Sequence, residues 1–287
     1  MSRAEEILQA RRRIVAANGL DFEVFEAGEG DRLALLLHGF PQNALVWRRV
    51  LPLLVARGYR VWAVNQRGYG ETSRPKEREA YALGPLLADV AGLIDASGAT
   101  QTTLIGHDWG GLLGFAFAAR RLRPLERLVV FNAPHPACFS RALQEPKQKR
   151  RSRYIGFFRL PFLPELLLGA GGAALIDRAL RKGAGAVDEE IVALYRAQAA
   201  RPGALTAMLN WYRAALPETL SAQDIERPFD TPTLLFWGDR DFALSRVCLD
   251  GTENYATHIE IVRLARGGHW GPEDGGAEVA AALAARL

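Results

Sequence analysis

One ten-residue stretch, 102–111, constrains the fold of this chain more than any other part of its sequence. It reads Thr-Thr-Leu-Ile-Gly-His-Asp-Trp-Gly-Gly, an apolar, β-branched run that ends in glycine and is followed by residues with helical spacing. The pattern predicts a strand, a very tight turn and a helix, with Gly106 and Gly110 placed where a Cβ atom would collide across the turn. Asp108 stands at the tip, where the Gly-x-nucleophile-x-Gly motif carries its nucleophile. We therefore predict that Asp108 is held in a strained backbone conformation.

The aspartate at this position determines which chemistry the sequence favours. A carboxylate is ionised at neutral pH, so it can displace a leaving group from a saturated carbon without first losing a proton. The product is an alkyl ester of Asp108, and its hydrolysis needs a histidine that activates water. An oxyanion hole and an acid that orients the histidine complete the requirement.

Strands alternate with helices along most of the chain. This alternation predicts an α/β fold with a mostly parallel central sheet that helices cover on both faces. Residues 14–27 suggest an edge strand pair that is broken at Asn18-Gly19. Further strands are expected at 33–37, 59–65, 102–105, 128–131, 233–237 and 259–262, and helices at 46–57, 83–97, 109–121 and 277–287.

The pattern changes between Asn132 and Arg227, where the sequence shows helical stretches and no convincing strand. An insertion at this point lies over the C-terminal ends of the strands, where open α/β sheets hold their sites. We therefore divide the chain into an α/β-hydrolase-type core of residues 1–132 and 228–287 and an inserted helical cap of residues 133–227. Within the cap, helices are expected at 154–158, 173–181, 188–199 and 205–214.

The other members of the predicted site follow strands later in the chain. The loop after the strand at 233–237 contains two aspartates, Asp239 and Asp241, that compete for the role of orienting acid. His269 follows the last strand and is predicted to take a proton from water. The order nucleophile, acid, histidine is the one that the hydrolase template requires.

The pocket around the nucleophile is expected to be apolar. The backbone N–H groups of Phe40 and Trp109 are predicted to form the oxyanion hole, because they follow the first core strand and the nucleophile. The cap is rich in Phe, Leu and Trp, so an apolar or aromatic small molecule is the expected substrate. The side chains expected to line its pocket are Phe40, Trp109, Phe157, Trp211 and Trp270.

Four motifs together resemble the epoxide hydrolases of the α/β-hydrolase superfamily, and the resemblance covers nearly the whole chain. In that family a nucleophilic aspartate opens the oxirane ring while two cap tyrosines hold and protonate its oxygen. The resemblance implies hydrolysis of an epoxide to a vicinal diol through an ester of Asp108. The motifs are Leu37-His38-Gly39-Phe40-Pro41, Gly106-His107-Asp108-Trp109-Gly110-Gly111, Asn210-Trp211-Tyr212-Arg213 and Gly268-His269-Trp270.

The resemblance also assigns roles to individual residues. Asn-Trp-Tyr-Arg matches the second tyrosine of the family at Tyr212, and Trp-Gly-x-x-Asp-Phe matches its acid at Asp241 in preference to Asp239. The family's Tyr-Phe-x-x-Pro frame has Phe157 where the first tyrosine belongs. Tyr154 lies one helical turn earlier on the same face, so it is the candidate for the first tyrosine.

Three alternatives remain open at this point. A haloalkane dehalogenase would share the aspartate, but that family carries asparagine after His-Gly, where this chain has Phe40. A fluoroacetate-type haloacid dehalogenase would carry arginine after the nucleophile, where this chain has Trp109. The third alternative, from another functional class, is a catalytically silent scaffold that binds a ligand or a partner.

Composition places the remaining limits. The chain has 287 residues, 49% of them hydrophobic, and a formal net charge of +4. Its N-terminus lacks the apolar core of a signal peptide and its two cysteines suit reduced thiols, so we expect a cytoplasmic enzyme. The basic run Lys147–Arg153 is interpreted as a solvated helix face, so neither nucleic acid nor membrane is expected as a partner. We expect no metal or cofactor, and a monomer or homodimer.

Overall fold

The computed structural model describes residues 1–182 and 188–287, and its centre is an eight-stranded sheet in the order β1-β2-β4-β3-β5-β6-β7-β8. β2 runs antiparallel to both β1 and β4, whereas the pairs from β4 to β8 are parallel. The α/β-hydrolase fold with a mostly parallel sheet is therefore confirmed. The strands are β1 (Arg11–Ala17), β2 (Leu20–Ala27), β3 (Arg32–Leu37), β4 (Arg60–Val64), β5 (Gln101–His107), β6 (Arg127–Phe131), β7 (Thr233–Gly238) and β8 (Ile259–Leu264).

The edge pair expected around Asn18-Gly19 is also confirmed. β1 and β2 form a hairpin in which Asn18 has φ 48° and Gly19 has φ 72°. Two successive positive φ angles give the turn a twist that matches the twist of the flanking strands, and Asn-Gly adopts them at little cost. The hairpin thereby places two antiparallel strands at one edge of the parallel sheet.

Helices cover both faces of the sheet. α3 (Leu83–Ser97) and α4 (Trp109–Ala119) pack together on one face, and α2 (Leu51–Val55) packs with α13 (Gly276–Arg286) on the other. The continuous helix expected at 46–57 was wrong, because a 3₁₀ helix, η1, ends at Arg49 and α2 begins at Leu51. Pro52 has no N–H to donate to the preceding turn. Shorter core elements are α1 (Arg3–Leu8), η1 (Ala44–Arg49), η2 (Arg78–Tyr81), η5 (Arg246–Cys248), η6 (Thr252–Asn254) and α12 (Gly271–Asp274).

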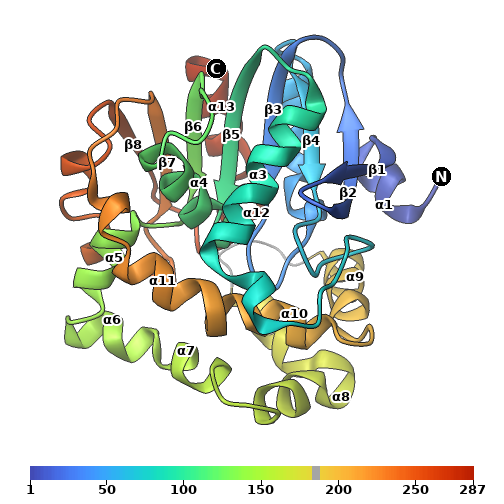
Figure 1. The fold of residues 1–287 in the computed structure, drawn as a ribbon, viewed down its shortest axis with the longest axis vertical. Helices are drawn as coiled ribbons and strands as arrows, with labels where there is room; N and C mark the ends of the chain where they lie inside the picture. The colour runs from blue at the N-terminus through green and yellow to red at the C-terminus, as the bar shows by residue number, and fades with distance from the viewer. Residues whose placement is uncertain (183–187) are drawn as a thin grey trace.

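Between β6 and β7 the described residues form helices and connecting loops. Figure 1 shows α6 to α10 gathered beyond one end of the sheet, with the C-terminus at the other end. We propose that this segment, residues 133–227, is a cap over the site. Its elements are α5 (Pro136–Ala142), α6 (Pro146–Arg151), α7 (Arg153–Phe158), α8 (Leu163–Leu180), α9 (Glu189–Ala199), α10 (Ala204–Asn210), η3 (Trp211–Ala215), α11 (Leu216–Ser221) and η4 (Gln223–Glu226).

Two cap helices differ from the regular helices that the sequence indicates. The helix expected at 173–181 is the second half of α8, whose backbone leaves the helical region from Ala170 to Ala173 because Gly171 and Gly172 take positive φ angles. The helix expected at 205–214 changes at Trp211 into the single π-helical turn η3. Such turns hold one extra residue, which local propensity does not reveal.

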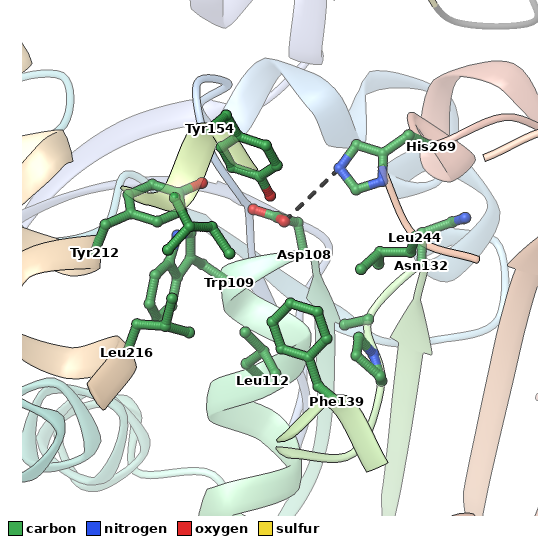
Figure 2. A pocket seen from close by; sticks show the side chains of 13 residues that line it. Asp108, Trp109, Leu112, Asn132, Phe139, Tyr154, Tyr212, Leu216, Leu244 and His269 are labelled. Carbon is green, nitrogen blue, oxygen red and sulfur yellow. Dashed lines mark ion pairs between the residues drawn. The ribbon is translucent and has the colours of Figure 1, made fainter. Parts of the chain in front are cut away.

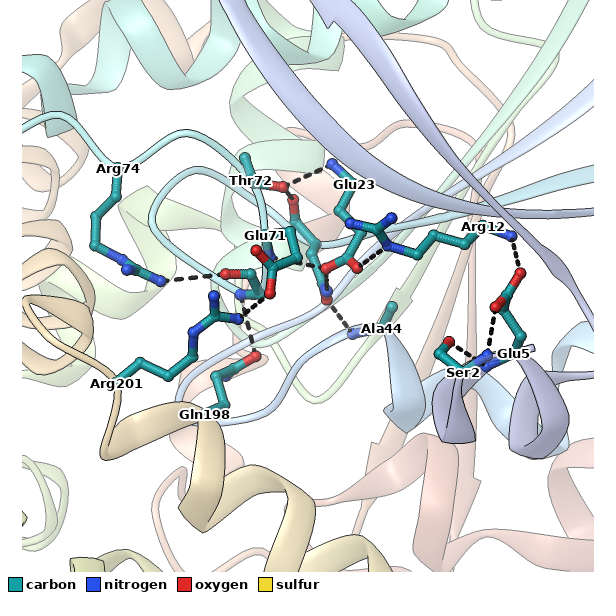
Figure 3. A network of polar contacts seen from close by, with 12 residues as sticks. Ser2, Glu5, Arg12, Glu23, Ala44, Glu71, Thr72, Arg74, Gln198 and Arg201 are labelled. Atoms are coloured by element: carbon teal, nitrogen blue, oxygen red, sulfur yellow. Dashed lines mark hydrogen bonds and ion pairs between the residues drawn. The ribbon is translucent and has the colours of Figure 1, made fainter.

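Polar contacts hold the cap against the core near the hairpin (Figure 3). Gln198 of α9 accepts hydrogen bonds from the Asn43 side chain at 2.9 Å and from the Gly70 amide at 3.3 Å. Arg201, just after α9, pairs with Glu71 at 2.6 Å. These contacts fix α9 over the loop that follows β4, so the cap has a defined position over the ends of the strands.

Candidate active site

Asp108 lies on the turn between β5 and α4, with φ 51° and ψ −113°. The turn is closed by glycines, as the sequence predicts. A Cβ atom on Gly106 would lie 2.2 Å from the Gly110 carbonyl oxygen, and one on Gly110 would lie 2.0 Å from the carbonyl oxygen of Leu37. No side chain fits at either distance, so α4 can begin directly after the strand only with glycine at both positions. The strained conformation holds the Asp108 side chain away from the sheet.

His269 connects two carboxylates. Its Nε2 lies 3.7 Å from Asp108 Oδ2, and its Nδ1 lies 2.9 Å from Asp241 Oδ2 (Figure 2 shows the first contact). Asp241 accepts further hydrogen bonds from the Asn132 side chain at 2.9 Å and from the amide of Leu244 at 2.8 Å. This donor set fixes the Asp241 carboxylate, which in turn holds the imidazole with Nε2 facing Asp108.

The charges of this group are coupled through burial. Burial lowers the pKa of His269, but the carboxylates of Asp241 and Asp108 outweigh it and raise that pKa to about 8. Burial opposes ionisation of Asp241, yet His269 and the surrounding donors lower the pKa of Asp241 below its ordinary value. Burial raises the pKa of Asp108, a shift that His269 and two backbone amides reduce. The lowered pKa favours the ionised form of Asp241 beside His269.

The two predicted oxyanion-hole amides face the Asp108 carboxylate. The Phe40 N–H donates to Asp108 Oδ1 at 2.9 Å, and the Trp109 amide also hydrogen-bonds the Asp108 carboxylate. Oδ1 therefore faces the Phe40 amide while Oδ2 faces His269. The two oxygens are thus distinguished before any ligand arrives.

Tyr154 and Tyr212 approach Asp108 from the cap. Tyr154 comes from α7 and Tyr212 from the π-helical turn η3, and their ring centroids lie 6.2 Å apart. Figure 2 shows both hydroxyls directed toward the Asp108 carboxylate. Burial, reinforced by neighbouring acidic groups, raises the pKa of both phenols above the ordinary tyrosine value. Both hydroxyls consequently keep their protons at neutral pH.

Two cavities meet at these residues, since Asp108, Tyr154, Tyr212 and His269 line both of them. One, which we call the wide lobe, has a volume of about 200 Å³. The other, the tight lobe, has a volume of about 20 Å³ and is drawn in Figure 2. Both walls are mostly apolar, and the four side chains common to them all carry polar groups. The other members of the tight-lobe wall are Trp109, Leu112, Asn132, Ala133, Pro134, Phe139, Ile155, Leu216 and Leu244.

Comparison with known proteins shows the family of this chain. Residues 35–276 match the family model described as alpha/beta hydrolase fold. The chain belongs to the α/β-hydrolase family. It is 36% identical over 264 residues to the AB hydrolase superfamily protein YfhM of Bacillus subtilis, covering 90% of this chain and 91% of that protein. It is 34% identical over 269 residues to epoxide hydrolase 4 of Mus musculus, covering 90% and 73%.

Solved structures give the same family assignment. A structure from a study of novel epoxide hydrolases in metagenomes from hot environments superposes with a TM-score of 0.86 at 30% identity, covering 96% of this chain and 98% of that one. A product complex of an epoxide hydrolase variant from Bacillus megaterium gives 0.84 at 26% identity, covering 95% and 99%. The resemblance to epoxide hydrolases that the motifs indicated is therefore confirmed.

Three of the five side chains expected to line the pocket line one of the two cavities, and two do not. Phe40 and Trp270 line the wide lobe and Trp109 lines the tight lobe. Among the described residues, neither Trp211 nor Phe157 belongs to either wall. The Trp211 indole points the other way and donates to the Arg67 carbonyl oxygen at 3.2 Å.

Phe158 takes the position expected for Phe157. Phe157 packs on Phe158 with ring centroids 5.9 Å apart, and it is Phe158 that lines the wide lobe. Adjacent residues of a helix point in directions about 100° apart, so only one of the pair can face the site. Tyr154 and Phe158, four residues apart, share that face and pack edge to face at 5.3 Å.

The site also contains residues that the sequence analysis missed. Asn132, which has φ 44° at the end of β6, donates to Asp241. Its position after a strand adjacent to the nucleophile strand could have indicated it, since parallel strands end at the same edge of a sheet. Leu168 and Ile176 of α8 line the wide lobe, and no local pattern distinguishes them from the other apolar residues of α8.

In residues 1–182 and 188–287 no group of three or more His, Cys, Asp or Glu side chains is placed to hold a metal ion. Cys138 and Cys248 are buried free thiols. None of the helices that the structure describes is long and apolar enough to cross a bilayer.

Proposed function

We propose that this protein is an epoxide hydrolase that converts an apolar or aromatic epoxide to a vicinal diol. The observation that carries the proposal is the convergence of two buried phenol hydroxyls on the carboxylate of Asp108 at the junction of two apolar cavities. Opening an oxirane requires both a nucleophile at carbon and a proton donor at oxygen. We further expect activity without a cofactor, in the cytoplasm, as a monomer or homodimer.

In the first half-reaction Asp108 Oδ2 attacks a ring carbon. The new C–O bond forms as the ring C–O bond breaks, and the ring oxygen takes a proton from Tyr154 or Tyr212. The raised pKa of both phenols keeps them protonated until charge develops on that oxygen. The product is a 2-hydroxyalkyl ester of Asp108, and no atom leaves the substrate.

In the second half-reaction water attacks the carbonyl carbon of the Asp108 ester. His269 Nε2 takes the proton of that water, and Asp241 stabilises the imidazolium through its 2.9 Å contact with Nδ1. Oδ1 becomes the oxyanion and is held by the amides of Phe40 and Trp109. Collapse of this intermediate breaks the bond to the diol oxygen, which takes the proton from His269 as it leaves. The proton remaining on the Asp108 carboxyl returns to the tyrosinate, so the diol is released and all the residues regain their starting states.

Esterification of Asp108 also changes the pKa of His269, the proposed base. The Asp108 carboxylate helps to raise the pKa of His269 to about 8, so the free enzyme holds much of its histidine in the protonated form. An ester at Asp108 carries no charge, so the pKa of His269 falls when the intermediate forms. The first step thereby favours the neutral imidazole that the second step uses.

The alternatives fit less well. A halide leaves as an anion and takes no proton, so a dehalogenase has no use for two buried phenols beside the nucleophile. A silent scaffold would not need an ordered relay from Asp241 through His269 to Asp108. The named relatives also favour an epoxide, because the mouse protein is called an epoxide hydrolase and the Bacillus megaterium enzyme is bound to an aryloxy diol product.

The test is an intact-mass measurement on a His269→Gln variant incubated with styrene oxide and, separately, with a bromoalkane. Without the base the ester accumulates, and we expect a mass increase equal to the whole epoxide. The double variant Asp108→Ala with His269→Gln is the control and should gain no mass. An increase equal to the alkyl group alone, with release of bromide, would instead assign the enzyme to the dehalogenases. No adduct with either reagent would favour the silent scaffold.

A further inference from the structure

Exposed apolar side chains are concentrated on one part of the cap. Nine large apolar residues are exposed in the part of the chain that the structure describes, and six of them lie within residues 160–175. Phe162 is 85% exposed and Leu166 is 70% exposed. We call these six the cap-edge patch; its other members are Leu160, Leu163, Leu167 and Leu175.

The patch forms a surface on α8 and the turn before it. Leu163, Leu166 and Leu167 are spaced three and four residues apart, so they share one face of the helix. Buried neighbours on the opposite face, Pro164 and Leu168, show that the helix itself is packed normally. Exposed apolar surface concentrated in this way marks an interaction site in a folded protein.

Positive charge lies next to the patch. On α6 and α7 the residues Lys149 and Arg153 are four apart and exposed, whereas Gln148 and Ser152, which precede them, are buried. Six exposed cations here pair with no carboxylate of the described residues; they are Lys147, Lys149, Arg150, Arg153, Arg159 and Arg178.

This charge is a property of the segment and not of the whole surface. Residues 143–182 contain nine Lys and Arg against three Asp and Glu, an excess of six, whereas the whole chain has a net charge of +4. The rest of the molecule is therefore slightly acidic. Two of the three acids, Glu165 and Asp177, are already paired with Arg213 and Arg181 at 2.7 and 2.8 Å. The positive field at this edge is thus largely uncompensated.

The patch also adjoins the cavity. α6, α7 and α8 follow one another along the edge of the molecule farthest from the C-terminus (Figure 1). α8 contributes Leu168 and Ile176 to the wall of the wide lobe, and Leu175 belongs both to that wall and to the exposed patch. A surface that binds the cap-edge patch would therefore lie beside the wide lobe.

We propose that the cap-edge patch and its basic flank bind the surface of an anionic phospholipid bilayer. Phe162 and the neighbouring leucines enter the boundary between headgroups and acyl chains, while the lysines and arginines contact lipid phosphates. A second copy of the chain fits less well, because pairing the patch with itself would bring two uncompensated positive flanks together. The sequence analysis interpreted the run Lys147–Arg153 as a solvated helix face. In this proposal the same run contacts lipid phosphates.

The experiment measures how the full-length protein partitions onto sedimented vesicles of phosphatidylcholine mixed with phosphatidylglycerol, and onto vesicles of phosphatidylcholine alone. We expect binding to the anionic vesicles that is about tenfold stronger and that weakens as salt is added. A Phe162→Ser, Leu166→Ser variant and a Lys149→Glu, Arg159→Glu variant should each lose most of this binding.

Matched controls separate this proposal from the catalytic one. The Ile14→Ser, Ile261→Ser variant removes two exposed apolar residues of the core strands and should bind vesicles as the unmodified protein does. All variants should turn over a water-soluble epoxide at unchanged rates without vesicles, which also shows that they fold. Equal binding to both vesicle types, or binding to neither, would overturn the proposal. So would a solution dimer that becomes a monomer in the Phe162→Ser, Leu166→Ser variant while vesicles bind nothing.

Discussion

At the scale of single residues, the pKa of His269 depends on the charge of its neighbours more than on its own burial. Isolated in an apolar pocket it would be a neutral imidazole with a lowered pKa, as His107 is, where burial lowers the pKa to about 3. Two carboxylates reverse that shift and raise the pKa of His269 to about 8. The pKa of His269 is therefore set mainly by Asp241 and Asp108.

The choice between Asp241 and Asp239 can be tested by a matched pair of variants. Asp241→Asn removes the charge that orients His269, and we expect kcat to fall by about 10³–10⁴. Asp239 instead pairs with Arg263 at the surface, so Asp239→Asn should leave kcat within about twofold. Steady-state hydrolysis of styrene oxide provides the measurement. A larger loss in Asp239→Asn than in Asp241→Asn would reverse the assignment.

A second residue-scale prediction concerns pH. The base acts when neutral, so single-turnover hydrolysis of the ester should rise about tenfold per pH unit on the acidic side and then level off. Since the ester removes the Asp108 charge, the midpoint should lie below the value of about 8 expected for His269 in the free enzyme. Rapid-quench kinetics gives the first midpoint, and an NMR titration of the free enzyme gives the second. Two equal midpoints would contradict the proposed change of base strength.

The two phenols are tested separately and together. Tyr154→Phe and Tyr212→Phe should each slow formation of the ester by about 10–10² because one proton donor remains, and the double variant should lose about 10⁴. Hydrolysis of an ester already formed should change little. Stopped-flow tryptophan fluorescence follows both steps, since Trp109 adjoins Asp108 and Tyr212. An unchanged rate in Tyr154→Phe would leave Tyr212 as the sole acid.

At the scale of elements, two local geometries position the reacting groups. The glycine-closed turn between β5 and α4 holds Asp108 at φ 51°. The π-helical turn η3 holds Tyr212 against Trp109 and Phe40, with ring centroids 5.1 and 5.4 Å apart. The turn between β5 and α4 follows from Gly106 and Gly110, which are evident in the sequence. The π-helical turn follows from packing between the cap and the core, which local sequence does not specify.

The turn can be tested with two alanine substitutions. Gly110→Ala puts a Cβ atom 2.0 Å from the Leu37 carbonyl oxygen, so strand and helix must separate, and we expect a loss of about 3 kcal/mol or more in the free energy of unfolding. Gly156→Ala in α7 meets no atom within 4 Å and should stabilise by about 0.5–1 kcal/mol. Urea denaturation measures both. A mild effect at Gly110 would contradict the close approach.

At the scale of the whole molecule, the candidate site lies where the proposed cap meets the core. The core provides Asp108, Asp241 and His269, while α7 and η3 provide the two tyrosines. The cap also makes the two lobes unequal, because Leu216 of α11 and Phe139 of α5 narrow the tight lobe to about 20 Å³. We therefore expect a preference for substrates with one large substituent, placed in the wide lobe.

Shortening the Leu216 side chain tests whether the tight lobe selects substrates by shape. Leu216→Ala should raise kcat/KM for an epoxide substituted on both carbons, such as trans-stilbene oxide, by about tenfold, while styrene oxide changes little. Leu220→Ala on the same helix lies outside the tight-lobe wall and should alter neither rate. The ratio of the two kcat/KM values is the measurement. An equal increase for both substrates would show that the lobe does not select shape.

The sequence alone was enough for the fold class, and it supplied the candidates for the triad in the order nucleophile, acid, histidine. These depend on local rules: glycines that permit one turn, apolar runs that mark buried strands, and loops that follow strands ending at one edge. Asp108 and His269 were predicted in this way, whereas Asp241 was preferred to Asp239 through the family resemblance. The structure brings all three side chains together.

Tertiary structure decided which neighbouring side chains face the cavity. Phe158 lines it instead of Phe157, and Trp211 turns toward Arg67 while Tyr212 turns toward Asp108. Such choices depend on helix rotation and on contacts between segments far apart in the chain, which hydrophobic periodicity does not contain. The same holds for the cap edge, where leucines indistinguishable by sequence are buried at position 168 and exposed at position 166. Burial is set by what packs against a residue, and only the folded chain supplies that neighbour.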